Sequence, residues 1–103
     1  MDLEQSFYVA ESVLHGYGLF AKIPIAAGSY LGEYEGPERT ENGMHVLWVE
    51  ETPGNWIGRD GDNILRYLNH SVQPNTEFDG FKLYALFDIA AEEELTFDYG
   101  EEP

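Results

Sequence analysis

Short apolar runs, separated by glycine, proline, asparagine and aspartate, make up this chain, and no stretch sustains a helical period. An amphipathic helix needs apolar residues at every third or fourth position, whereas a strand needs only a few alternating residues between turns. The 103 residues, 43% of them hydrophobic, have room for one small core. We therefore predict a mostly β fold and a single domain over residues 1–103.

Eight short strands are expected, each bounded by turn-forming residues. They lie near residues 7–10, 19–21, 30–34, 45–49, 55–58, 76–78, 82–87 and 95–97. The Asp79-Gly80 pair is typical of a type I′ hairpin turn, which has two positive φ angles. Residues 64–68 are expected to form one or two helical turns.

The charge is strongly acidic, with 20 Asp and Glu residues against five Lys and Arg residues and a formal net charge of -15. Such a surface repels phosphate backbones and anionic lipids, so we expect no direct binding to nucleic acid and no membrane association. The same field attracts a basic protein or peptide, although a simple role in solubility explains the charge equally well.

Cysteine is absent, which excludes disulfides, thiolate zinc sites and cysteine nucleophiles. The N-terminal residues lack the basic and apolar segments of a signal peptide, and no apolar run approaches the length of a membrane span. We expect a soluble intracellular protein of the cytoplasm or of a nucleus, a host nucleus included. Because a domain of this size is marginally stable alone, a homodimer or a bound ligand is an open source of extra stability.

The first segment with candidate functional residues is 12–21, where Gly16 and Gly18 flank Tyr17. Two glycines permit positive φ and a close approach of the backbone to a ligand, but a single Gly-x-Gly is more often a turn. No Gly-Lys-Ser/Thr follows, so a phosphate-binding loop is disfavoured.

The second segment is 66–75, in which Asn69 offers an amide, His70 an imidazole and Ser71 a hydroxyl. A Ser/His/Asp hydrolase is disfavoured, because neighbouring side chains point apart on an extended chain. The three histidines of the chain, His15, His45 and His70, show no metal-ligand spacing, so we expect no metal site.

The third segment is 94–100, where Leu95, Phe97 and Tyr99 alternate with Thr96 and Asp98. This is the period of a strand with large residues on one face, which core packing alone explains. The order of the three segments along the chain is the more specific signal.

Together the segments resemble the SET domain family of protein-lysine methyltransferases. The similarity lies in the Gly-x-Gly segment that ends in Leu-Phe-Ala, the Arg-Tyr-Leu-Asn-His-Ser segment with its following Pro-Asn, and Glu-Leu-Thr-Phe-Asp-Tyr-Gly. Residues 25–28, 33–36 and 62–63 agree as well, so the resemblance covers nearly the whole chain. It implies a fold of small curved β-sheets with a knot-like threading of the C-terminal segment, an exception to the usual avoidance of threading.

The resemblance also implies a cofactor, S-adenosylmethionine, and a basic substrate such as a histone, a ribosomal protein or another DNA-associated protein. The residues implied to hold the cofactor are His15, Gly16, Tyr17, Gly18, Arg66, Asn69, His70 and Tyr99.

Three aromatic residues carry the implied chemistry. Tyr99 matches the catalytic tyrosine, Phe97 the position that limits the degree of methylation, and Tyr34 a wall of the lysine channel. Because Phe97 has no hydroxyl to hold a water molecule or an amine, we expect di- or trimethylation.

One feature departs from many members of the family: the sequence has three residues after Gly100, so we expect it to lack the cysteine-rich zinc segment that closes their channel. We expect a second subunit or the substrate to cover the site, or nothing to cover it, in which case activity would be poor. Two alternatives remain, a non-catalytic SET-like module that binds basic peptides and a structural homodimer without a ligand.

Overall fold

The computed structural model describes residues 3–98, and residues 1–2 and 99–103 lie outside that description. The elements along the chain are α1 (Leu3–Ser6), β1 (Phe7–Glu11), β2 (Tyr17–Ala21), β3 (Tyr30–Glu33), β4 (Glu38–Arg39), β5 (Val46–Thr52), β6 (Asn55–Asp60), η1 (Ile64–Tyr67), β7 (Asn69–His70), β8 (Thr76–Asp79), β9 (Lys82–Ala85) and β10 (Glu94–Phe97). Strands dominate, so the prediction of a mostly β fold is confirmed. No helix within residues 3–98 combines the length and apolar character needed to span a membrane.

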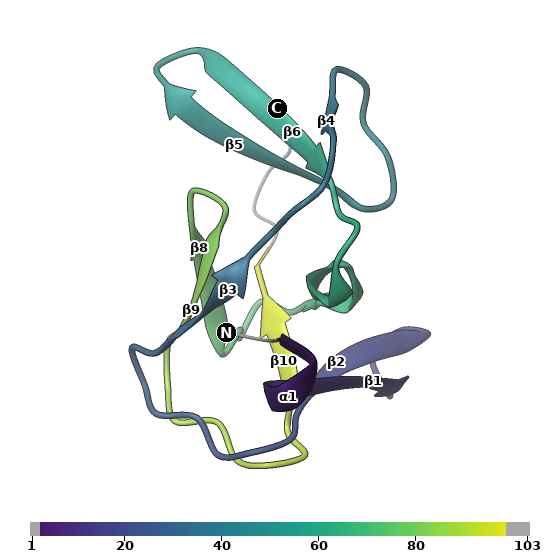
Figure 1. Ribbon diagram of the computed structural model, residues 1–103, viewed down its shortest axis with the longest axis vertical. Helices are drawn as coiled ribbons and strands as arrows, with labels where there is room; N and C mark the ends of the chain where they lie inside the picture. The colour runs from purple at the N-terminus through teal and green to yellow at the C-terminus, as the bar shows by residue number, and fades with distance from the viewer. Residues whose placement is uncertain (1–2, 99–103) are drawn as a thin grey trace.

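The strands form three small sheets, with the orders β1-β2-β10-β7, β3-β9-β8 and β4-β6-β5. Figure 1 shows the β4-β6-β5 sheet at one end of the molecule and the β1-β2-β10-β7 sheet at the other, with the third sheet between them. The molecule is accordingly elongated, with extents of 37, 27 and 27 Å.

Strand β10 is central to the largest sheet, because it pairs antiparallel with β2 and parallel with β7. The segment after β7 continues along β10. The amide of Ser71 donates to the Phe97 carbonyl at 3.0 Å, and the hydroxyl of Thr76 donates to the Thr96 carbonyl at 2.7 Å. The chain around Asn69 is thereby held against the C-terminal strand, while the end of the expected threading lies outside the described residues.

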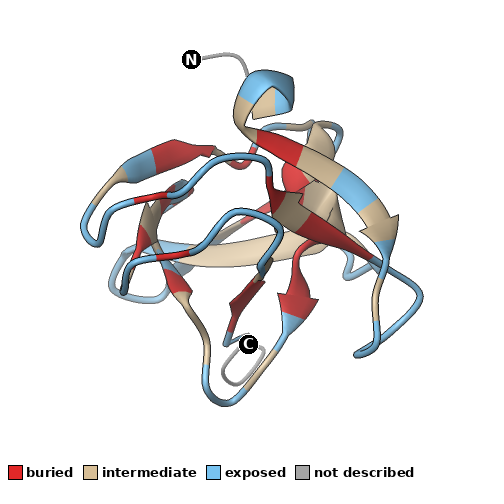
Figure 2. Ribbon diagram, turned by 90° about the horizontal axis from the view of Figure 1, so that it is seen from below, coloured by how far each residue is buried: buried red, intermediate tan, exposed pale blue. Residues whose placement is uncertain are grey.

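The core lies where the β1-β2-β10-β7 and β3-β9-β8 sheets meet η1. Its most completely buried apolar side chains are Phe7, Leu19, Leu65, Leu83, Ile89 and Leu95. Figure 2 shows buried positions along the inward-facing strands and exposed positions in the loops that join them. The β4-β6-β5 sheet packs the partly buried side chains of Leu47, Val49 and Ile57 against this core, and Gly58 is the one fully buried residue in its three strands.

All eight predicted strands and the predicted helical turn are present, with ends shifted by up to three residues. Elements α1, β4 and β7 were not predicted, since segments of two to four residues are too short to show a period. Strand β9 ends at Ala85 rather than at Phe87, because its partner β8 begins at Thr76, which pairs with Ala85.

The predicted hairpin is present, but its turn type was wrong. Asp79 pairs with Lys82, so the two loop residues are Gly80 and Phe81. Only Gly80 has a positive φ, of 63°, and this is the pattern of a type II′ turn with glycine first. The turn therefore starts one residue later than predicted.

Candidate functional site

Asn69 brings together the three segments singled out in the sequence. Its side chain is buried, and its amide nitrogen donates to the carbonyls of His15 and Tyr17 at 3.1 and 3.0 Å. The same nitrogen donates to the Glu94 carboxylate at 2.9 Å. All three partners are acceptors, which fixes the orientation of the amide. The Oδ1 atom of Asn69 accepts no hydrogen bond from residues 3–98, so it is available to a ligand.

The loop between β1 and β2 is closed by Ser12. The Ser12 amide donates to the Gly16 carbonyl at 2.8 Å, and its hydroxyl accepts from the Leu14 amide at 3.0 Å. That hydroxyl lies 2.7 and 2.9 Å from the two carboxylate oxygens of Glu94, to which it donates. Ser12, Asn69 and Glu94 therefore form one hydrogen-bonded cluster, which we call the polar clamp.

Gly16 and Gly18 have different roles in this loop. Gly16 has a φ of 45°, a backbone conformation that favours glycine. Gly18 needs no positive φ, but a Cβ atom there would lie 2.9 Å from Cδ of Glu94 and 3.1 Å from Nδ2 of Asn69. The first glycine serves the turn and the second leaves room for the polar clamp.

The sequence-predicted cofactor residues fall into two groups. His15, Gly16, Tyr17 and Gly18 lie beside Asn69, with His70 next along β7. Arg66 lies on η1, just before β7 in the chain, where its guanidinium carbon is 5.8 Å from the centre of the Tyr67 ring.

A small cavity of about 60 Å³ lies between the start of β5, η1 and the end of β10. Its lining includes Tyr34, Leu47, Leu68 and Phe97, together with His45 and Arg66. The Phe78 ring packs edge-on between Tyr34 and Phe97, at centroid distances of 5.8 and 5.1 Å. Two of the three predicted catalytic aromatics, Tyr34 and Phe97, thus line one narrow cavity.

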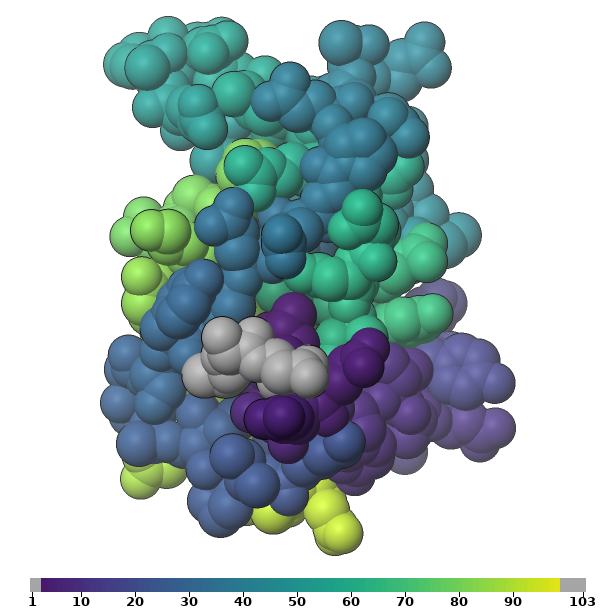
Figure 3. Space-filling view, viewed as in Figure 1, coloured from purple at the N-terminus to yellow at the C-terminus, as the bar shows by residue number. Residues whose placement is uncertain are grey.

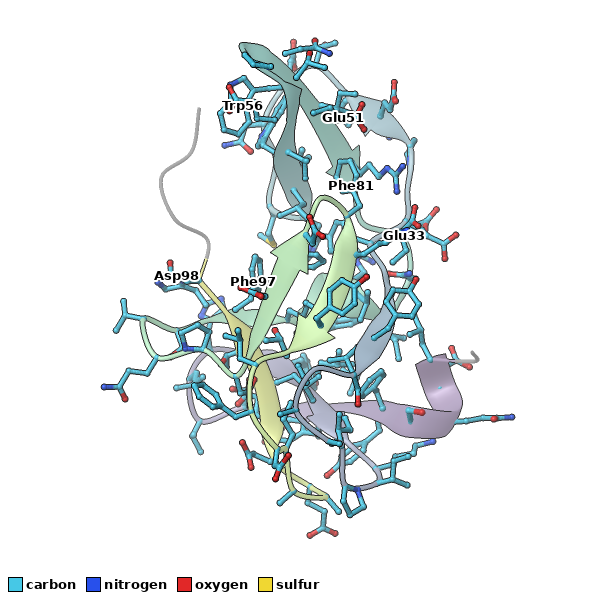
Figure 4. All side chains as sticks on the ribbon, turned by 90° about the vertical axis from the view of Figure 1, so that its left-hand side faces the viewer. Glu33, Glu51, Trp56, Phe81, Phe97 and Asp98 are labelled. Atoms are coloured by element: carbon cyan, nitrogen blue, oxygen red, sulfur yellow. The ribbon has the colours of Figure 1, made fainter. Side chains whose placement is uncertain are left out.

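A groove of about 430 Å³ adjoins this cavity, since Leu47 and Phe97 line both. It runs between β5 and the β8-β9 hairpin, where Figure 3 shows a notch in the surface. Figure 4 shows Phe97 and Asp98 at the end of β10, below the hairpin that carries Trp56. Among the described residues that line the groove, Glu77 and Asp98 are charged and both are acidic.

Tyr34 and His45 join this cavity to the β4-β6-β5 sheet, which we call the outer sheet. The Tyr34 hydroxyl donates to the His45 carbonyl at 2.6 Å. The His45 ring places Nδ1 3.1 Å from the Arg66 carbonyl, to which the Nδ1-protonated tautomer donates. His45 is thus hydrogen-bonded within the fold, and its place at the cavity was not predicted.

Tyr99, the predicted catalytic residue, lies outside the described residues. Asp98 just before it lies 3.8 Å from His70, measured from Oδ1 to Nδ1. No group of three His, Cys, Asp or Glu side chains within residues 3–98 is placed to hold a metal ion.

Ser12 and Glu94 were not predicted as site residues from the sequence. Their contact joins positions 82 residues apart, which no local period reveals. The available signal was that each lies inside one of the three family-like segments.

The comparisons with known proteins agree with this geometry. A histone-lysine N-methyltransferase of Saccharomyces cerevisiae, described as H3 lysine-4 specific, is 34% identical over 113 residues, which cover 87% of this chain and 10% of that protein. The histone-lysine N-methyltransferase ash1 of Drosophila melanogaster is 31% identical and is matched over 82% of this chain and 5% of its own length. The chain thus spans about a tenth or less of these relatives.

Solved structures show the same fold. A humanized mutant of the Chaetomium thermophilum Polycomb Repressive Complex 2 has a TM-score of 0.72 at 28% identity, over 92% of this chain and 14% of that one. The methyltransferase domain of human PR domain-containing protein 2 has a TM-score of 0.73 at 23% identity, over 94% of this chain and 78% of that one. A family model described as the SET domain matches residues 16–100. Apart from Ser12 and His15, which lie just before it, the described site residues fall within that matched range, and the chain belongs to the SET domain family.

Proposed function

We propose that this chain is a protein-lysine methyltransferase that uses S-adenosylmethionine and acts on a basic protein. The observation that carries the proposal is the narrow aromatic cavity between Tyr34 and Phe97, which adjoins an acidic groove. The matched relatives named above are histone-lysine N-methyltransferases, which supports the same activity. We further propose that residues 1–103 act as one SET domain.

The described residues fit the cofactor. The backbone of residues 15–18 with Asn69 and His70 would hold it, and Oδ1 of Asn69 is free to accept from an ammonium group. Arg66 offers Nε, a buried donor without an acceptor among the described residues, which a carboxylate would satisfy. Bound S-adenosylmethionine would supply a methyl group on a sulfonium, ready for displacement by a neutral amine.

The protein's own residues select that amine in two stages. Glu77 and Asp98 in the groove attract a cationic peptide and raise its encounter rate. The small cavity then removes an entering lysine from solvent beside Tyr34 and Phe97, and this desolvation disfavours the ammonium form because it lowers the pKa of an amine. Positioning the neutral nitrogen is the main task of Tyr34 and Phe97.

The degree of methylation depends on Phe97 in this proposal. Phe97 presents no hydroxyl to the cavity, so a partly methylated amine can rotate and accept a further methyl group. We expect di- or trimethyl-lysine from the native chain and mainly monomethyl-lysine from Phe97→Tyr, measured by mass spectrometry of the product. A native product series that stops at monomethyl-lysine with every substrate tried would contradict this part of the proposal.

The substrate class is a basic protein, for which histones and ribosomal proteins are the first candidates. Both classes place the proposed activity inside the cell. A homodimer is a further part of the proposal, as one way to cover the groove, and sedimentation at assay concentrations tests it.

The deciding experiment incubates the purified chain with labelled S-adenosylmethionine and a panel of basic proteins. Tyr99→Phe removes the hydroxyl that the family resemblance assigns to catalysis, and Tyr30→Phe removes an exposed hydroxyl on β3 as a matched control. We expect methyl-lysine from the native chain and the control, and a loss of at least about a hundredfold in rate for Tyr99→Phe.

The alternative function, a non-catalytic module for basic peptides, gives a different result. It predicts that a basic peptide binds while no methyl group is transferred and S-adenosylhomocysteine does not bind. Equal rates for Tyr99→Phe and the native chain would instead contradict the role of that hydroxyl.

A further inference from the structure

Glu94 has contacts that its strand does not require. Its backbone is already placed by β10, where Glu94 pairs with Phe20 and Leu95 with Leu19. Its side chain takes no part in the pairing of the strands, and its carboxylate accepts hydrogen bonds from Ser12 and Asn69 at 2.7–2.9 Å. Hydrogen bonds to an ionised carboxylate are about twice as strong as those between neutral groups. The carboxylate therefore acts on the 12–16 loop rather than on its own strand.

The loop has little else to hold it. No residue from Ser12 to Gly16 is buried, and Val13 and Leu14 are 101% and 53% exposed. Apolar burial thus contributes little to its conformation. What fixes the loop is its hydrogen bonds, of which Ser12 and Asn69 make those that reach the rest of the molecule.

The absence of a side chain at position 18 belongs to the same arrangement. A Cβ atom on Gly18 would meet the Glu94 carboxylate before any other group. Gly18 is in extended backbone on β2 and has no need of a positive φ. The second glycine of the Gly-x-Gly segment is therefore explained by the carboxylate beside it.

We propose that Glu94 is a positioning residue that acts through Ser12 and Asn69 to hold the 12–18 segment in its cofactor-binding conformation. This inference rests on the proposed function and concerns its affinity for the cofactor. A segment ordered before binding avoids the entropy cost of being ordered on binding, so the polar clamp raises affinity without touching the ligand.

The test measures binding of S-adenosylhomocysteine by calorimetry to full-length variants. Glu94→Ala removes the acceptor, and Ser12→Ala removes one donor with a smaller risk to folding. We expect the dissociation constant to rise by about tenfold or more for Glu94→Ala and severalfold for Ser12→Ala. Ser12→Thr, which keeps the hydroxyl, should restore the native value.

Two control variants match these changes away from the polar clamp. Glu92→Gln removes a charge from an exposed glutamate near β10, and Ser71→Ala removes a hydroxyl that accepts from the Gln73 amide. Both should bind S-adenosylhomocysteine as the native chain does. The KM for a basic substrate should stay unchanged in all variants, because the groove lies outside the polar clamp.

Each result decides a separate question. No binding of S-adenosylhomocysteine by the native chain contradicts the proposed function itself. Native-like binding by both Glu94→Ala and Ser12→Ala, or an equal loss in cofactor affinity and in substrate KM, overturns the positioning role of Glu94 alone. A rise confined to the cofactor constant, with rescue by Ser12→Thr, supports it.

Discussion

The two regions on either side of the candidate site are held by different contacts. The 12–18 segment is joined to β7 and β10 by side chains, through the polar clamp of Ser12, Asn69 and Glu94. The β4-β6-β5 sheet is joined to the rest by Arg59 of β6, which donates to the Glu33 carboxylate at 2.7 Å and to the Tyr34 carbonyl at 3.1 Å. The hydrogen bonds of Tyr34 and His45 add to this connection at the start of β5. The first region forms part of the largest sheet, whereas the second lies at one end of the molecule and packs only partly buried side chains against the core (Figure 1).

This difference agrees with the two roles proposed for the enzyme, cofactor binding at the 12–18 segment and substrate binding beside the β4-β6-β5 sheet. A cofactor of constant structure is best served by a segment fixed in advance, because pre-organisation lowers the cost of binding. The exposed positions of the β4-β6-β5 sheet can change, and so can its substrate, at little cost to the core, whereas Leu47, Val49 and Ile57 pack against that core. Substitutions that separate the two regions test this interpretation.

The largest effect is expected for Asn69→Asp. The change is isosteric, but it replaces two donors by an acceptor that faces two carbonyls and the Glu94 carboxylate. A buried charge without a partner and the lost hydrogen bonds together should lower the free energy of unfolding by about 3 kcal/mol or more. Urea denaturation measures this loss, and S-adenosylhomocysteine binding should disappear with it.

Asn42→Asp is the matched change in the outer sheet, in the loop between β4 and β5. Asn42 uses its oxygen, which accepts from the Gly43 amide and the Trp48 indole, and aspartate keeps that oxygen. Stability should stay within about 0.5 kcal/mol of the native value. If both substitutions cost the same, the contrast between the two regions is wrong.

The second largest effect is expected for Gly18→Ala, at about 2 kcal/mol. The methyl group would displace the Glu94 carboxylate, so the penalty should shrink when Glu94 is already shortened. A double-mutant cycle of Gly18→Ala and Glu94→Ala should give a coupling free energy of at least about 1 kcal/mol. Additive penalties would show that Gly18 is required for another reason.

The sequence predicted the strands better than the contacts between them. Periods of two and turn residues identified eight strands, but Ser12 and Glu94 make a contact across 82 residues that no period encodes. The turn at Gly80 was placed one residue early because Asp-Gly is compatible with either register. Tyr34 and Phe97, which line one cavity in the structure, were grouped from the sequence only because the family resemblance related segments far apart in the chain.

A smaller effect is expected for Tyr34→Phe, which cuts one link between the outer sheet and the cavity. The lost hydrogen bond to the His45 carbonyl should cost about 1 kcal/mol. Amides of β5 and β6 should then exchange hydrogen faster, while those of β1 and β2 keep their native rates. Unchanged exchange in β5 and β6 would mean that the Tyr34 hydroxyl does not hold the sheet.

The smallest effect on stability is expected for Trp48→Phe in the outer sheet. The indole is partly exposed and its one hydrogen bond is to Asn42 on the surface, so the free energy of unfolding should change by about 0.5 kcal/mol or less. Trp48 lines the groove, however, whereas Trp56 on the paired strand is absent from the groove lining. The KM for a basic substrate should therefore rise severalfold for Trp48→Phe and stay native for Trp56→Phe, because an aromatic surface beside acidic groups attracts cations. Equal KM values for the two variants would move the substrate away from the β5 side of the groove and leave the outer sheet without its proposed role.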